Sequence, residues 1–262
     1  MLKREENLLN TKDIYSGKAD LYVTGRPCYP PETVDFLHSA LRISPATIIA
    51  DIGAGTGIFT QYLLETGAYV FAVEPNQDML ERAGQQLNKY SNFKAINAPA
   101  EKTTLPSLSI DLISVAQALH WFATKQTKKE FERILRPGGS YLFLWNDRLK
   151  DYDDFHQGLE AILINNLETY VAQGVQDIKP QDLVYRFLGT KNFITQTLVN
   201  DQQLSKAGLL GRVFSSSYSP DIESTLGRFL RGRIESLFES HNTEGKVCIK
   251  YETTIICAGD TR

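Results

Sequence analysis

The sequence predicts an α/β fold with a doubly wound, mostly parallel sheet. Short and almost entirely apolar segments are separated by segments whose apolar residues have helical spacing. Strands that are apolar on both faces are typical of a parallel sheet covered by helices on both sides. The predicted strands are 46–53, 68–74, 92–98, 110–117 and 141–145, with a long final strand at 246–259.

Helices are expected between these strands. Pro30 and Pro31 open the first, because proline is favoured at the start of a helix and apolar residues follow on one stripe. Asn76 is the expected N-cap of a helix that ends at 87. Further helices are predicted at 58–67 and 124–135, and a turn at 136–139.

The second half of the chain contains fewer strand-like segments. Residues 151–171 and 221–240 have apolar residues at helical spacing, and 192–204 is strand-like. Residues 215–220, Ser-Ser-Ser-Tyr-Ser-Pro, predict a loop. We therefore interpret 146–190 as a helical insertion that packs over the carboxyl edge of the sheet.

Composition and charge exclude several classes. The chain has 262 residues, 42% of them hydrophobic, which is enough to bury a core without disulfides or a metal. A net charge of −3 argues against a broad basic surface for nucleic acid. Cys28, Cys248 and Cys257 are scattered, which favours reduced thiols. No apolar run is long enough for a membrane span and the N-terminus lacks a secretory pattern, so a cytoplasmic protein is expected.

A glycine-rich loop follows the first predicted strand. It reads Asp51-Ile-Gly53-Ala-Gly55-Thr-Gly57 and leads directly into a helix. Glycines allow the backbone to approach a ligand closely, and ligands of open parallel sheets bind at this edge. Glu74 ends the second strand, where a carboxylate can accept hydrogen bonds from both hydroxyls of a ribose. The pattern therefore indicates a nucleoside-containing ligand.

The spacing of the glycines distinguishes between the classes of nucleotide-binding site. A dinucleotide fingerprint requires glycine at position 58, where this chain has Ile58. An NAD-dependent oxidoreductase is therefore a disfavoured alternative. The glycine-lysine pattern of nucleoside triphosphate sites does not occur.

These residues resemble the class I S-adenosylmethionine-dependent methyltransferases. The chain is similar to the small-molecule branch with a type 11 methyltransferase domain, which includes trans-aconitate methyltransferases. Besides the glycine loop, the matching segments are 72–75 (Ala-Val-Glu-Pro), 100–106, 116–122 (Ala-Gln-Ala-Leu-His-Trp-Phe) and 135–139. The resemblance implies a Rossmann-like sheet of seven strands, the last antiparallel, with a helical lid. It also implies one methyltransferase domain over 1–262, divided into a cap segment 1–45, a cofactor-binding core 46–145, a lid 146–190 and a sheet completion 191–262.

The same resemblance implies S-adenosylmethionine as cofactor and S-adenosylhomocysteine as product. Asp51 would receive the ammonium group of the cofactor, Glu74 its ribose hydroxyls and Arg26 its carboxylate. Pro99 stands where many relatives carry an aspartate for the adenine amino group. The implied cofactor contacts are Tyr22, Arg26, Asp51, Gly53, Ala54, Gly55, Thr56, Gly57, Glu74, Pro75, Met79, Ala100, Glu101 and Gln117.

His120 is the candidate catalytic residue, and His120 and Trp121 are the candidate substrate contacts. Methyl transfer from a sulfonium depends on holding the acceptor in line in a dry pocket. A base is needed only when the acceptor must lose a proton. His120 as a structural imidazole beside Trp121 stays an open alternative. No cluster with metal-ligand spacing occurs, so no metal is expected.

The sequence thus predicts methylation of a small molecule. A carboxylate oxygen is the favoured acceptor, because it needs no base. The alternative is a catalytically idle regulatory protein that binds S-adenosylmethionine. Neither a nucleic acid nor a membrane is expected as a partner, and the oligomeric state is left open. Three arginines could suggest a phosphate-binding surface, namely Arg228, Arg231 and Arg233. Acidic residues lie near them on the same predicted helix, which favours a solvated helix face.

Overall fold

The computed structural model describes residues 25–172 and 178–259. The strands are β1 (Ile48–Ile52), β2 (Tyr69–Val73), β3 (Phe93–Ile96), β4 (Ile110–Ala116), β5 (Leu135–Arg148), β6 (Phe193–Leu204) and β7 (Val247–Gly259). The helices are α3 (Glu32–Leu41), α4 (Ile58–Glu65), α5 (Gln77–Leu87), α6 (Leu119–Phe122), α7 (Lys125–Ile134), α8 (Asp154–Asn166), α9 (Glu168–Ala172), α10 (Pro180–Leu188), α11 (Lys206–Phe214) and α12 (Thr225–His241).

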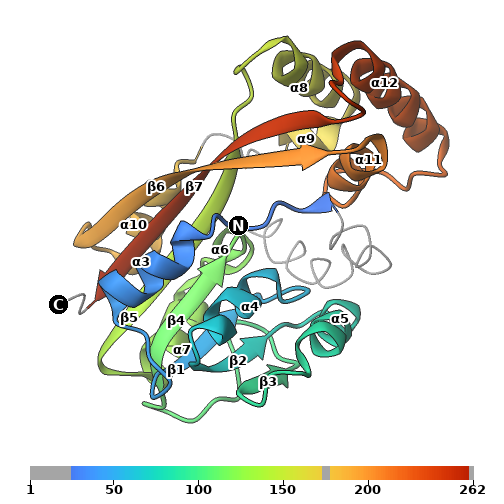
Figure 1. The fold of residues 1–262 in the computed structure, drawn as a ribbon. Helices are drawn as coiled ribbons and strands as arrows, with labels where there is room; N and C mark the ends of the chain where they lie inside the picture. The colour runs from blue at the N-terminus through green and yellow to red at the C-terminus, as the bar shows by residue number, and fades with distance from the viewer. Residues whose placement is uncertain (1–24, 173–177, 260–262) are drawn as a thin grey trace.

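The strands form a seven-stranded sheet in the order β3-β2-β1-β4-β5-β7-β6 (Figure 1). Neighbours from β3 to β5 are parallel, whereas β7 runs antiparallel to both β5 and β6. The predicted fold class is confirmed, including the antiparallel last strand. Successive strands are added on one side of β1 up to β3 and then on its other side from β4 onward. Open α/β sheets bind ligands at such a switch point between β1 and β4.

Helices cover both faces of this sheet, which explains the apolar strand sequences. On one face, Ile49 and Leu142 pack with residues of α3 and α4. On the other face, Ala50 and Phe143 pack with residues of α7 and α10. Because successive strand residues point to opposite faces, most positions of such a strand are apolar. The buried polar residues Asp51 of β1 and Ser114 of β4 are exceptions.

The predicted start of α5 is confirmed. The side chain of Asn76 accepts a hydrogen bond of 3.0 Å from the amide of Met79. The same arrangement begins α7, where Thr124 accepts from the amide of Thr127. These caps fix the point at which each chain segment leaves the carboxyl edge of the sheet.

Four helices and the adjoining ends of β6 and β7 form a third apolar cluster, which we call the helical cap. It contains α8, α9, α11 and α12, and Figure 1 shows it at one end of the long β6–β7 ribbon. Two of these helices come from the segment 191–262 and not from 146–190. Conversely, α10 lies against the sheet, because Val184 and Phe187 pack with the core residue Phe131.

Three local expectations need correction. The turn at 136–139 is a bulge inside β5, since Leu135 pairs with Ile110 whereas Ser140 pairs with Leu112. The helix at 151–171 is two helices, because the extended backbone at Leu167 ends α8. The helix α11 has no counterpart among the predicted elements. It begins at the N-cap Ser205, whose hydroxyl accepts from the amide of Gly208.

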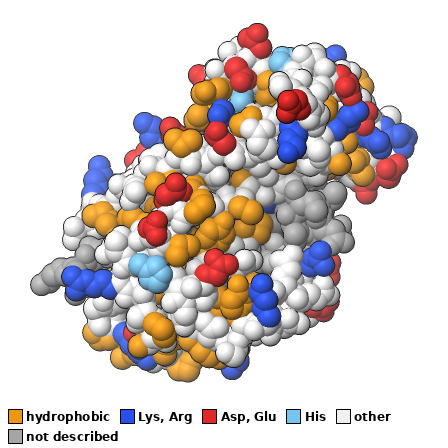
Figure 2. Space-filling model, viewed as in Figure 1, with side chains coloured by type: hydrophobic (Ala, Val, Ile, Leu, Met, Phe, Trp, Pro, Cys, Tyr) orange, Lys and Arg blue, Asp and Glu red, His pale blue; other side chains and the backbone are white. Residues whose placement is uncertain are grey.

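The surface carries charges of both signs. On the face drawn in Figure 2, Lys and Arg side chains are interspersed with Asp and Glu, most densely over the helical cap. Among the described residues, no helix combines the length and the apolar character that a membrane crossing requires. The three cysteines are free thiols; Cys28 is exposed and Cys257 is buried.

Candidate functional site

The glycine loop lies at the carboxyl edge of β1, beside β2. The amide of Gly53 donates to the carbonyl of Val73 over 2.8 Å, which ties the loop to β2. Gly55 has a φ of +57°, and a Cβ placed on it would meet nothing within 4 Å. The loop therefore presents bare backbone to open space at this position, as a site for a closely bound ligand requires.

Glu74 faces the glycine loop. Its Oε2 accepts a hydrogen bond of 3.0 Å from the amide of Gly55, and its Oε1 accepts one of 2.9 Å from the amide of Asn76. The side chain is buried, with 9% of its residue surface exposed. Burial raises the pKa of Glu74, although both backbone hydrogen bonds act in the opposite direction. A carboxylate is thus held at the end of β2, as the sequence predicts.

Asp51 lies within β1, just before the glycine loop, and is more buried than Glu74. Its two oxygens accept hydrogen bonds of 2.6 Å from the hydroxyls of Thr60 and Ser114. Only 1% of the residue is exposed, and this burial raises the pKa of Asp51 to about 6. Both partners are neutral, and within residues 25–172 and 178–259 no ion pair compensates the burial of this carboxylate. Such a group stabilises a cation brought to it, for instance an ammonium.

Residues predicted beside an adenine differ in how much surface they offer. Met79 is 2% exposed and Ala100 is 5% exposed, so both belong to the packed interior. Pro75 is partly buried and Glu101 is exposed. Their contact with a cofactor stays a prediction. Asn97, which the sequence did not single out, lies here and donates from Nδ2 to the carbonyl of Glu74 over 3.1 Å.

A cavity of about 100 Å³ lies between the glycine loop, the segment before α3 and the helical cap. It brings together five residues that the sequence predicts for the site, which are Arg26, Asp51, Gly53, Ala54 and Gln117. It also contains residues that sequence reasoning missed, among them Tyr29, Asn146 and Arg212. Tyr22 falls outside the described residues.

Gln117 has an unusual backbone at the end of β4. Its φ of +59° is in the left-handed region, which a side chain with a Cβ rarely adopts. The conformation is held by a hydrogen bond from the Gln117 amide to the carbonyl of Leu144, and Nε2 donates to the carbonyl of Asn146 over 3.1 Å. Strained positions of this kind concentrate at functional sites.

His120 and Trp121 follow on the short helix α6. Their ring centroids are 4.9 Å apart, and both residues are partly buried. Burial, aided by the charge of Arg26, lowers the pKa of His120 to about 4. The imidazole is therefore neutral near pH 7, and a neutral imidazole can both donate and accept a hydrogen bond.

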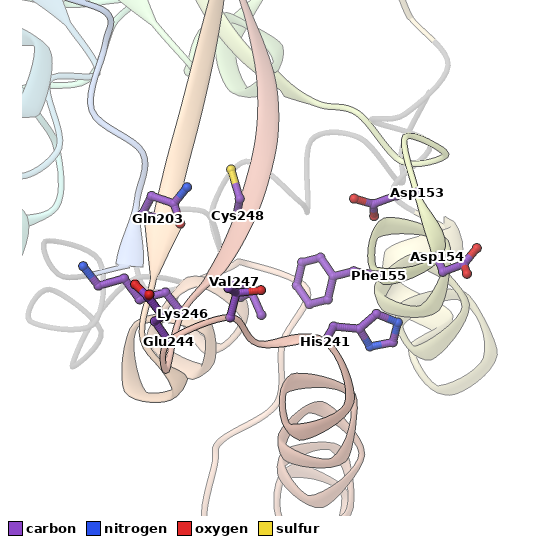
Figure 3. A pocket seen from close by; sticks show the side chains of 10 residues that line it. Asp153, Asp154, Phe155, Gln203, His241, Glu244, Lys246, Val247 and Cys248 are labelled. Carbon is purple, nitrogen blue, oxygen red and sulfur yellow. The ribbon is translucent and has the colours of Figure 1, made fainter.

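A larger cavity of about 790 Å³ lies at the far end of β6 and β7. Figure 3 shows Asp153, Phe155, His241 and Cys248 around it. Neither the glycine loop nor the end of β4 contributes to its lining. The smaller cavity at the sheet edge is therefore the candidate site, because it combines the ligand-binding edge of the fold with polar side chains.

Comparison with known proteins finds a family match for the segment that forms this edge of the sheet. Residues 50–143 match the methyltransferase domain family. The matched segment contains the glycine loop, Glu74, Gln117 and His120. An uncharacterized methyltransferase of Mycobacterium tuberculosis is 40% identical over 127 residues, which are 48% of this chain and 49% of that protein. The chain thus spans about half the length of the curated relative it matches.

Solved structures extend the likeness of fold beyond the methyltransferase domain. A candidate type II methyltransferase from Anaeromyxobacter dehalogenans is 22% identical, with a TM-score of 0.62 over 90% of this chain and 98% of that one. An S-adenosylmethionine-dependent methyltransferase from Geobacter sulfurreducens, solved with S-adenosylhomocysteine, is 16% identical, with a TM-score of 0.54. The match covers 94% of this chain and 97% of that chain. At these identities the likeness concerns the fold.

Proposed function

We propose that this protein transfers the methyl group of S-adenosylmethionine to a small molecule. The observation that carries the proposal is the pairing of the glycine loop with the Glu74 carboxylate, inside a segment that matches the methyltransferase domain family. The relative from Geobacter sulfurreducens, solved with S-adenosylhomocysteine, supports this choice of cofactor.

The residues present fit that cofactor. The open side of Gly55 provides room for a ligand against bare backbone. The buried hydroxyl of Thr56, in the same loop, has no hydrogen-bond partner among the described residues. Glu74 would accept from the ribose hydroxyls and Asp51 would face the ammonium group. The bound cofactor supplies an electrophilic methyl group on a sulfonium.

The chain's own contribution is to position the reactants at the sheet-edge cavity. Gln117, held in its strained conformation by Leu144, projects from the end of β4 toward the cavity lining. The neutral imidazole of His120 would orient the acceptor or take a proton from it. A carboxylate oxygen is the acceptor atom that we propose, because it is already deprotonated and needs no base.

We place the protein in the small-molecule branch that includes trans-aconitate methyltransferases, and in the cytoplasm. The run Gln117 to Phe122 supports the branch. Three free thiols support a reducing compartment. Residues 46–145 would bind the cofactor, with the helical cap closing the acceptor side.

Two measurements test the proposed function. Titration calorimetry with S-adenosylmethionine, S-adenosylhomocysteine and NAD should give binding of the first two and none of NAD. Incubation with a labelled methyl donor and a panel of organic acids and amines should then give labelled product from an acid. Binding of NAD alone would indicate an oxidoreductase instead. Binding of S-adenosylmethionine without transfer to any acid or amine would indicate a regulatory protein.

A further inference from the structure

Arg212 of α11 places a guanidinium at the candidate site from the helical cap side. Its Nε donates to the hydroxyl of Tyr251 over 2.7 Å, and its Nη1 donates to the hydroxyl of Ser216 over 3.1 Å. The guanidinium carbon also lies 5.8 Å from the centre of the Tyr251 ring. These contacts hold the side chain in one position within the interior.

All of these partners are neutral hydroxyl groups. Within the described parts of the chain, no ion pair joins Arg212 to a carboxylate. Arg148, which also lies in the interior near the helical cap, is paired with Glu160. A buried cation without a counter-charge is unfavourable unless a partner is brought to it. Arg212 is therefore a partly buried cation with no carboxylate partner among the residues that the structure describes.

The position of Arg212 shows where that partner would come from. Arg212 lines the cavity at the sheet edge, together with Asp51 and Gly53 of the glycine loop and with Gln117. Arg26 lines the same cavity and adds positive charge. Burial and, to a smaller extent, this charge lower the pKa of His120, and the charges of Arg212 and Arg26 lower the pKa of Tyr218. The side of the cavity opposite the glycine loop is thus cationic.

We infer that Arg212 binds an anionic oxygen group, a carboxylate or a phosphate, of the methyl acceptor. The inference rests on the proposed function and adds the substrate class to it. The guanidinium fork suits such a planar or tetrahedral oxyanion, since two N–H groups can donate to two oxygens. With the anion held at Arg212, a reacting atom of the acceptor lies between the helical cap and the glycine loop.

Calorimetry on the complex with S-adenosylhomocysteine tests this inference. The probes are succinate, citrate and inorganic phosphate, with dimethyl succinate as the uncharged counterpart. At least one anion should bind, and the succinate and phosphate arms distinguish a carboxylate from a phosphate acceptor. Arg212→Gln should weaken that binding by at least about tenfold, because it removes hydrogen bonds between charged groups. Arg231→Gln, which changes an exposed arginine of α12, is the matched control and should leave it unchanged.

The affinity for S-adenosylhomocysteine separates this inference from the proposed function. It should change by less than about twofold in Arg212→Gln if the guanidinium serves the acceptor. A large loss would mean that Arg212 holds the carboxylate of the cofactor, and would overturn the inference while leaving the proposed function intact. Failure of the unmodified protein to bind S-adenosylhomocysteine would count against the proposed function itself.

If Arg212→Gln does not fold, the inference can be tested on the unmodified protein by comparing the affinities of an anion and its uncharged ester. In the unmodified protein, succinate should bind at least about tenfold more tightly than dimethyl succinate, since only the anion can pair with the guanidinium. If phosphate is the anion that binds, trimethyl phosphate takes the place of the ester. Equal affinity of anion and ester, or no binding of any anion, would overturn the inference.

Discussion

Gly55 and Glu74 are joined by a hydrogen bond of 3.0 Å from the backbone amide of Gly55 to Oε2 of Glu74. The bond links the first βα loop to the end of the neighbouring strand, across nineteen positions of sequence. It orients the carboxylate before any ligand is present. Each oxygen accepts one backbone hydrogen bond and keeps a further lone pair, which a ribose hydroxyl can use.

Glu74→Gln should weaken the binding of S-adenosylhomocysteine by about 1.5–3 kcal/mol, because charge-assisted hydrogen bonds to the ribose become neutral ones. Calorimetry measures the change directly. Glu65→Gln alters an exposed glutamate on α4 and serves as the control. An unchanged affinity in Glu74→Gln would remove this carboxylate from the cofactor site.

Gly55→Ala and Gly84→Ala should have opposite effects on stability. At both glycines a Cβ would meet nothing within 4 Å, so neither change creates a clash. Gly55 has a φ of +57°, where a side chain costs about 1–2 kcal/mol. Gly84 lies inside α5, where alanine stabilises by about 0.5–1 kcal/mol. Urea unfolding of both variants measures the difference.

The affinity for S-adenosylhomocysteine is a second measurement that distinguishes Gly55→Ala from Gly84→Ala. Gly55→Ala should also bind S-adenosylhomocysteine more weakly, because the new methyl group occupies the open side of the loop. Gly84→Ala should bind it normally. Normal binding by Gly55→Ala would show that no ligand approaches this part of the loop.

The sequence was sufficient for the core of the fold and for placing the glycine loop beside Glu74. Strands such as Tyr69–Val73 are apolar throughout because both faces are covered, and that pattern survives in a single sequence. The glycine loop and Glu74 were predictable for a related reason. Their positions depend on backbone conformation and on the end of a strand, both of which are local properties.

The side of the cavity that we propose for the acceptor was not predictable, because it is assembled from distant segments. Arg212 reaches the cavity only because α11 packs into the helical cap, and its partner Tyr251 lies thirty-nine positions later, on β7. Asn146 reaches the cavity because β5 continues past the parallel sheet to pair with β7. No local pattern distinguishes either residue from a surface arginine or a loop asparagine. Only tertiary packing does so.

Asp51 should make the stability of the protein depend on pH. Burial raises its pKa from 3.8 to about 6, so the folded protein binds this proton more tightly than the unfolded chain. The resulting stabilisation is fully present below about pH 3.8 and is lost as the pH rises through about 6. The loss amounts to at most about 3 kcal/mol.

Asp51→Asn isolates this contribution, because an amide does not ionise. The difference in unfolding free energy between Asp51→Asn and the unmodified protein should shift in favour of the variant between pH 5 and pH 8. Urea unfolding at the two pH values measures it, with Asp35→Asn on the exposed side of α3 as the control. A difference that is independent of pH would mean that Asp51 is ionised in the fold at both pH values.

His120→Ala should lower methyl transfer at saturating cofactor by at least about tenfold, if the imidazole orients or deprotonates the acceptor. Because the pKa of His120 is lowered to about 4, the imidazole stays neutral down to that pH. Its protonation should therefore cause no loss of turnover between pH 8 and pH 5.5. His38→Ala, at the end of α3, is the control. Normal turnover of His120→Ala would support the structural alternative.

His156 should be a structural residue whose loss loosens the helical cap. The imidazole is completely buried; Nε2 accepts from the amide of Lys250 over 2.9 Å, so Nδ1 carries the proton and donates to Asp153 over 2.5 Å. This pair of bonds ties the start of α8 to β7. His156→Leu leaves the Lys250 amide without its partner, and should lower the unfolding free energy by about 1–3 kcal/mol.

Urea unfolding measures this loss, and His38→Leu is the matched control because its imidazole makes one hydrogen bond near an exposed helix end. The affinity for S-adenosylhomocysteine should stay unchanged in His156→Leu, since the imidazole belongs to neither the glycine loop nor the sheet-edge cavity. An unfolding curve identical to that of the unmodified protein would contradict the structural role. A loss of cofactor affinity at full stability would mean that the cap and the glycine loop are coupled more tightly than their contacts imply.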